Sequence, residues 1–320
     1  MLFWRRGPAE GHSLSDHLVS TTRRKPIRVG GQAVIEGVMM RSPNSMAVAV
    51  RKPNGEIVVK QEGLNFFSEK HLFFKFPLVR GVITLLSALV LGIRALNFSA
   101  NQALSEGEGE KDPSSWTMNI TFVVALCFGI FLFFLIPLFL TKWMRFAIPM
   151  LSESGLLFNL VDGAIRLMIF LAYLWAISFS KEIRRVFEYH GAEHKSIFAF
   201  ESGEELVIDR VKGFSYLHPR CGTSFLLVVM VVSILVFALI PHHLPFGYKV
   251  ASRVVFIPLI AGLSYEIIRF ADQKRESRGI QYFIMPGLWL QRLTAREPSE
   301  AQIEVALRAL QAVLELEGRR

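Results

Sequence analysis

Residues 118–141 read MNITFVVALCFGIFLFFLIPLFLT and contain no charged side chain. At about 1.5 Å per residue, a helix of this length can cross a hydrocarbon core of roughly 30 Å. Lys142 and Arg145 follow, where the polar boundary of a membrane would lie. Pro137 is expected to bend the helix, which neighbouring helices can accommodate. The stretch predicts a membrane-spanning helix and an α-helical integral membrane protein.

The composition of the whole chain favours the same class. Of 320 residues, 52% are hydrophobic and 27 are phenylalanine, more apolar side chain than a soluble chain of this size can bury. The net charge is +9, but no RNA- or DNA-binding motif accompanies it. Basic loops in a membrane protein reflect topology and anionic headgroups. The lipid bilayer, and not nucleic acid, is therefore the expected partner.

Neither the cysteine content nor the N-terminal residues indicate a secreted protein. The two cysteines, Cys127 and Cys221, form no readable disulfide framework, which favours a reducing or intramembrane setting. The N-terminal residues lack an apolar core followed by a small-residue cleavage site, so no secretory signal is predicted.

Further apolar runs at about 156–180, 223–240 and 247–270 predict three more membrane helices. Together with the first span they form two pairs of expected transmembrane helices, within 117–180 and 223–270. The sequence thus predicts about four membrane crossings.

Charged residues interrupt the apolar segments at two places. In residues 71–100, only thirteen uncharged residues separate Arg80 from Arg94, which span roughly 20 Å as a helix. This is short of the hydrocarbon thickness, so a re-entrant or interfacial helix is expected there. Asp162 and Arg166 are four residues apart, and we expect them to form a salt bridge near the membrane boundary.

The remaining regions are polar and are expected outside the membrane. Asn54-Gly55 between β-branched runs predicts a hairpin, and residues 204–215 are expected to contain strand. The predicted regions are a basic flexible tail at 1–28, a β unit at 29–70, a polar segment at 181–222 and a tail at 271–320 with an amphipathic helix at 299–317.

Charge places these regions relative to the membrane. Both tails and the polar segment are basic, so the positive-inside rule assigns all three, and with them the β unit, to the cytoplasm. Four crossings satisfy this arrangement, with short external loops at about 142–155 and 241–247. Lys142 and Arg145 in the first of these loops count against it.

The motif that carries chemistry is His190-x-x-Glu193-His194. On a helix, His190 and His194 lie one turn apart on one face, where two imidazoles can hold one divalent metal ion. Glu193 could then accept a proton from water, as in the inverted zincin order. The alternative is an ordinary hydrogen-bonded cluster on a solvated helix, and Gly191 weakens the helix prediction.

Several residues compete to complete such a site. Glu266 lies well downstream, as a third ligand does in the inverted zincin pattern, and is expected at the same boundary. Cys221, His218 and Glu36 are the other candidates. Three protein ligands and an open position are typical of catalytic zinc, which makes water acidic enough to react near neutral pH.

The chain resembles the YqhQ-like family of bacterial multi-pass membrane proteins over roughly residues 28–315. The motifs that carry the resemblance are GGQAVIEGVMMR at 30–41, EYHGAEHK at 188–195, HPRCGTSF at 218–225, SYE at 264–266 and PGL at 286–288. The resemblance implies a bacterial plasma-membrane protein and a metal-dependent enzyme whose reaction is not specified.

Two hypotheses from different classes follow. The first is a membrane-embedded metal-dependent hydrolase, with zinc at the cytoplasmic boundary and a peptide, a membrane-protein segment or a lipid-linked group as substrate. The second is a non-enzymatic scaffold or assembly factor, whose β unit and C-terminal helix bind other membrane proteins. A transporter is less favoured, because no internal repeat is present and few charges lie at membrane depth.

Overall fold

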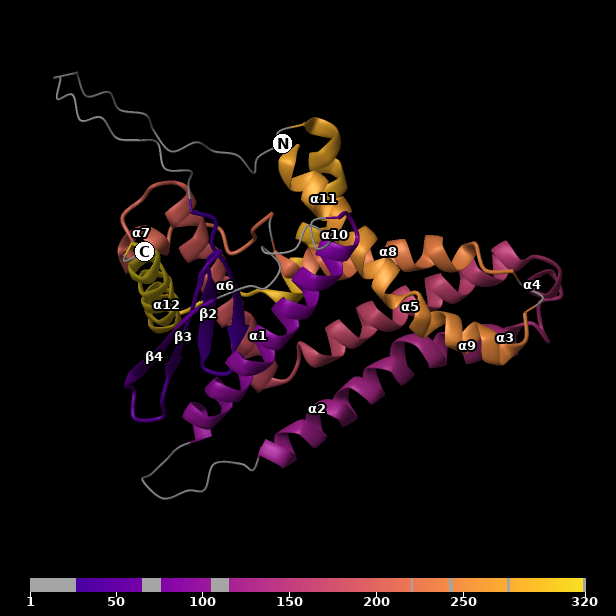
Figure 1. Ribbon diagram of the computed structural model, residues 1–320, viewed down its shortest axis with the longest axis horizontal. Coiled ribbons are helices and arrows are strands. Elements are labelled where there is room, and N and C mark those ends of the chain that lie inside the picture. Colours follow the sequence, from indigo (N-terminus) through magenta and orange to yellow (C-terminus); the bar gives the residue numbers. More distant parts are fainter. Residues whose placement is uncertain are drawn as a thin grey trace.

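The computed structural model describes residues 27–64, 76–104, 115–219, 221–241, 244–274 and 277–318. It has two parts. A small sheet and the helices packed on it occupy one end, and a body of long apolar helices extends away from them (Figure 1). This arrangement bears out the expected mostly helical chain with a small β unit.

The sheet is an antiparallel meander in the order β1-β2-β3-β4. Its strands are β1 (Gly30–Val34), β2 (Gly37–Arg41), β3 (Ser45–Arg51) and β4 (Ile57–Gly63). The hairpin predicted at Asn54-Gly55 is confirmed: it joins β3 to β4, and Gly55 has a φ of 89°, which glycine adopts without steric cost.

Both faces of the sheet are covered. Helix α1 (Val79–Leu104) packs on one face, where Leu91 and Ala95 contact side chains of β2 and β3. Helices α6 (Lys181–Glu201) and α12 (Glu300–Gly318) cover the other (Figure 1). Because β2 and β3 are buried on both sides, their sequences are nearly continuously apolar and do not alternate.

The C-terminal amphipathic helix is present as α12. Its apolar residues, including Ile303, Leu310 and Val313, are buried against the sheet and α6. The apolar face of α12 is therefore occupied within the chain.

Most of the other elements form the helical body. They are α2 (Ser115–Ile130), the π-helical segment η3 (Phe131–Leu135), α3 (Ile136–Met144), α4 (Met150–Glu153), α5 (Gly155–Ile177), α8 (Gly222–Ala238), α9 (Phe246–Val255), α10 (Ile257–Gln273) and α11 (Arg278–Thr294). Within the described residues, three helices are long and apolar enough to cross a membrane, or four if the bent pair α9 and α10 forms one span.

Two expected spans have matching helices. Residues 123–144 run through α2, η3 and α3, and 155–177 form α5. The π-helical turn ends two residues before Pro137, which cannot donate a backbone hydrogen bond and so disturbs the helix that contains it. The second expected pair of spans, within 223–270, corresponds to α8 and to the combination of α9 and α10. Helix α8 has 17 residues, and α9 and α10 meet at a bend of 44°.

Helix α1 differs from the expected short segment, because it runs unbroken for 26 residues and passes the length and composition test for a span. Its charges are accommodated at contacts with other elements. Arg80 is paired with Glu266 of α10, and Arg94 with Glu62 of β4. Its second half lies on the sheet, so α1 links the helical body to the β unit.

Two other expectations have different outcomes. The strand expected at 204–215 is wrong: the segment forms a short helix, α7 (Ile208–Val211), flanked by turns. The salt bridge between Asp162 and Arg166 is confirmed, with 2.6 Å between Oδ2 and Nη2. Most of the expected basic tail at 1–28 lies outside the described residues.

Candidate metal centre

Helix α6 positions the three residues of the H-x-x-E-H motif. The helix is continuous through Gly191, and close packing explains why this position is a glycine. A Cβ atom at this position would lie 1.9 Å from the backbone oxygen of Arg296. The glycine therefore lets the segment before α12 approach the helix directly, and helix propensity is sacrificed for this contact.

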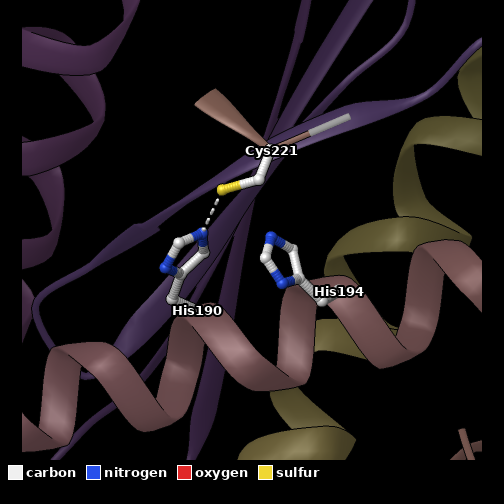
Figure 2. Close-up of side chains that lie close together, drawn as sticks. All are labelled: His190, His194 and Cys221. Carbon is white, nitrogen blue, oxygen red and sulfur yellow. Dashed lines mark hydrogen bonds between the residues drawn. The ribbon is translucent and has the colours of Figure 1, made fainter. Parts of the chain in front are cut away.

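Cys221 lies close to both imidazoles of the motif. The ring centroids of His190 and His194 are 4.3 Å apart, and Nε2 of His190 is 3.2 Å from Sγ of Cys221. One ligand atom from each of the three residues lies within 4.8 Å of the other two. Figure 2 shows both rings with a nitrogen directed toward the thiol, which comes from a distant segment of the chain.

Backbone carbonyl groups fix the tautomer of both rings. Nδ1 of His190 is 2.7 Å from the oxygen of Thr294, and Nδ1 of His194 is 2.5 Å from the oxygen of Tyr216. A carbonyl oxygen only accepts hydrogen bonds, so each Nδ1 carries the proton and each Nε2 presents a lone pair. This is the arrangement in which proteins hold metal-binding histidines.

Burial keeps His194 neutral. Only 2% of the residue is exposed, and this burial lowers its pKa, with the neighbouring His190 acting in the same direction. Among the described residues, its buried Nε2 has no partner at hydrogen-bonding geometry. Cys221 lies near both rings and can donate its one S–H proton to only one Nε2 atom at a time, so the other remains a buried lone pair.

The turn before α8 delivers the thiol. Cys221 is the N-cap of α8, and its sulfur accepts a hydrogen bond from the backbone N–H of Thr223. Buried Gln291 of α11 clamps the preceding turn: its Oε1 accepts from the backbone N–H of His218, and its Nε2 donates to the His218 carbonyl. The clamp fixes the position of Cys221 relative to α6.

Glu193 lies beside the three candidate ligands. It is 6% exposed, and its Oε2 is 4.0 Å from Nε2 of His190. Burial raises the pKa of its carboxyl group, while the imidazoles of His190 and His218 and the backbone N–H of Gly31 oppose this. A Cβ atom at Gly31 would come within 2.7 Å of Glu193 Cγ, so the glycine allows β1 to approach the carboxylate.

The other candidate ligands do not join the three. Both oxygens of Glu266 are bound by Arg80, at 2.7 and 2.5 Å. Glu36, at the β1–β2 turn, is paired with Arg185 and accepts from the Tyr189 hydroxyl at 3.3 Å. The Glu266 and Glu36 carboxylates therefore hold elements together instead of facing the cluster.

His218 lies next to the cluster but outside it. Its ring centroid is 5.7 Å from that of His194, and its Nε2 is 3.7 Å from Oε2 of Glu201. It is not among the three residues whose ligand atoms converge.

Sequence reasoning missed the groups that orient the site. The carbonyls of Thr294 and Tyr216 carry no signal in side-chain identity, because any residue supplies a carbonyl. Gln291 does carry a signal, because it is an amide four residues after Gly287 in an otherwise apolar stretch of the predicted tail. A polar side chain on the apolar face of a helix would have marked it, had the helix been predicted.

Comparisons with known proteins agree with the motifs. A family model described as "Protein of unknown function (DUF1385)" matches residues 76–316. The "Uncharacterized protein YqhQ" of Bacillus subtilis (strain 168) is 33% identical over 304 residues, which cover 92% of this chain and 94% of that protein. No solved structure matches. With most of its length matched in both comparisons, the chain belongs to the DUF1385 family.

Proposed function

We propose that the protein is a metal-dependent hydrolase acting at the boundary of the helical body, with zinc held by His190, His194 and Cys221. The observation that carries the proposal is the convergence of three ligand atoms within 4.8 Å of one another. The tautomers strengthen it, since both Nε2 atoms are left as lone-pair donors by the carbonyls that bind Nδ1.

The donor set favours zinc. Two neutral imidazoles and a thiolate are borderline-to-soft ligands that suit zinc, whereas magnesium and calcium prefer oxygen. Three protein ligands leave the fourth tetrahedral position open, as in catalytic sites, while structural zinc takes four. When bound, zinc polarises a substrate carbonyl and lowers the pKa of water to about 7.

Glu193 is assigned the proton-transfer role. Its carboxylate lies 4.0 Å from Nε2 of His190 and is held by the Gly31 N–H. Burial favours its neutral form, so after accepting a proton at Oε2 it can retain it and pass it to a leaving group. His190 keeps 13% of its side-chain surface exposed, which gives this side of the site its contact with solvent.

A neighbouring cavity suggests where a substrate enters. A cavity of about 320 Å³ lies between α8, α10 and α11, and Pro219 and Ser224, on either side of Cys221, line it. Its wall is mainly apolar, with Arg269 and Asp272 among the lining residues. Such a lining suits a peptide or lipid-linked group that emerges from a membrane, which is the substrate class we propose.

Metal analysis of the purified protein tests the proposal. We expect about one zinc per wild-type chain and a near-complete loss in His190→Ala/His194→Ala. The matched control is His242→Ala/His243→Ala, which also removes two histidines and should retain the metal. Equal, near-zero zinc in the wild type and the His190/His194 variant would remove the proposal.

Glu193→Gln separates binding from catalysis. The variant should retain zinc, because the three ligands are untouched, but lose zinc-dependent hydrolysis of an activated ester such as p-nitrophenyl acetate by about 10²–10⁴-fold. Unchanged hydrolysis in a zinc-loaded variant would contradict the role given to Glu193.

A further inference from the structure

A second polar cluster is buried in the helical body. Asp162 and Arg166 of α5 meet Lys249 and Arg253 of α9, and their relative exposures are 0, 1, 7 and 2%. Oδ2 of Asp162 lies 2.6 Å from Nη2 of Arg166 and 2.9 Å from Nη2 of Arg253. One carboxylate oxygen is thus shared between two guanidinium groups.

The charges of this cluster do not balance. Among the described residues, Asp162 is the one acid that acts on Arg166, Arg253 and Lys249, and Arg145 adds a further positive charge near Lys249. Two more cations than anions are therefore buried together. A buried charge is costly unless a counter-charge accompanies it.

The hydrogen-bond donors are also incompletely used. Among the described residues, Nε and Nη1 of Arg253 and Nε of Arg166 are buried without an acceptor. The ring of Phe237 faces both guanidinium groups, at 4.0 Å from that of Arg253 and 4.9 Å from that of Arg166. Contact with a ring face partly compensates the charge but leaves the donors at the guanidinium edge unpaired.

Asp162, in contrast, needs a hydrogen-bond donor. Its buried Oδ1 accepts no hydrogen bond from the residues that the structure describes. A ligand that fits must bring negative charge and several acceptor oxygens for the arginines, and one O–H donor for Asp162. A phosphate group that keeps one proton has all three. Free hydrogen phosphate, HPO4²⁻, carries two negative charges and one P–OH, and a singly protonated phosphate monoester carries one negative charge and one P–OH.

We propose that α5, α8 and α9 form a binding site for a phosphate group that carries one proton, either free hydrogen phosphate or the monoester head of a lipid such as phosphatidic acid. The site lies toward the end of the helical body where α3, α4 and α9 gather, away from the sheet (Figure 1). There the break between α9 and α10, at a 44° bend, brings polar residues inside an apolar body, as discontinuous helices do at ligand sites.

Thermal unfolding of delipidated full-length protein in a neutral detergent tests the site at pH 7. One arm adds sodium phosphate, with sodium sulfate and sodium chloride at equal ionic strength as references. The other arm adds phosphatidic acid to the micelles, with phosphatidylglycerol as the diester reference. We expect phosphate or phosphatidic acid to raise the unfolding temperature more than its reference does, and the arm that responds identifies the source.

The variants assign the effect to the cluster. Arg253→Gln should weaken the response to the effective ligand by about tenfold or more, while Arg308→Gln, which removes an exposed arginine of α12, should leave it unchanged. If Arg253→Gln does not fold, Lys249→Gln takes its place as the cluster variant. The comparison of each ligand with its reference in the wild-type protein also still tests the proposal. No stabilisation of the wild type by either ligand, an equal response to the diester, or an equal response in the folded variant would overturn the proposal.

Discussion

The two buried polar clusters of this protein present opposite chemistry. Around Cys221, two imidazole Nε2 atoms and a thiol offer lone pairs that converge. Around Asp162, two guanidinium groups offer N–H donors and excess positive charge. The chemistry of the first arrangement fits a cation, and that of the second fits an anion. Net charge and the direction of hydrogen bonding, more than burial itself, therefore distinguish what each cluster can bind.

The largest expected effect comes from removing the single acid of the second cluster. Asp162→Asn should destabilise the protein by about 3–5 kcal/mol in phosphate-free detergent, because buried cations lose their counter-charge. Added phosphate should recover part of this loss, since an anion replaces the missing charge. Thermal or denaturant unfolding measures both.

The matched control for this substitution is Glu62→Gln, which removes the acid of the more exposed pair with Arg94. Its cost should be at most about 1 kcal/mol. If the two substitutions cost the same, the buried cluster would not depend on charge balance, and the contrast between the two clusters would fail.

A steric substitution tests how the first cluster is assembled. Gly191→Ala places a Cβ atom 1.9 Å from the Arg296 oxygen, so α6 or the segment that carries Thr294 must shift. We expect a loss of about 1–3 kcal/mol from overpacking and reduced zinc retention. Gly213→Ala is the control, since its nearest contact would be an ordinary 3.6 Å. Full zinc retention in Gly191→Ala would show that this contact does not support the site.

A smaller effect is expected from the amide that clamps the thiol-bearing turn. Gln291→Leu removes the hydrogen bonds to the backbone of His218, and zinc affinity should fall by about 10–100-fold, as for other groups that orient ligands. Competition with a chromophoric chelator measures this. The control is Gln281→Leu on the exposed side of α11; equal affinities in the two variants would assign no orienting role to Gln291.

The sequence predicted the helical class and the β3–β4 hairpin, because each is encoded by local pattern: apolar length and an Asn-Gly turn. It left open whether the H-x-x-E-H segment is helical and predicted only that a helix would place His190 and His194 on one face. It also named Cys221, but without a reason to prefer it to Glu266. That choice depends on tertiary packing. Arg80 binds both oxygens of Glu266, and no local pattern in α1 or α10 indicates that these two helices meet.

The apparent exceptions to local rules had tertiary causes. Gly191 lowers helix propensity, yet the helix continues because the Arg296 carbonyl needs the space. The charges in 71–100 leave an uncharged run too short to cross a membrane and so predict a re-entrant or interfacial helix, whereas Arg80 and Arg94 are paired with Glu266 and Glu62. Pairing partners distant in sequence are invisible to a count of uncharged residues.

Replacement of zinc by cobalt(II) tests the central claim most directly, because a cobalt–thiolate bond gives a charge-transfer band in the near ultraviolet. We predict this band in the wild type and in Cys127→Ser, which removes the exposed cysteine of α2. The band should disappear in Cys221→Ser and in His190→Ala/His194→Ala. A cobalt-loaded wild-type protein without the band, or an undiminished band in Cys221→Ser, would contradict a metal centre formed by these three residues.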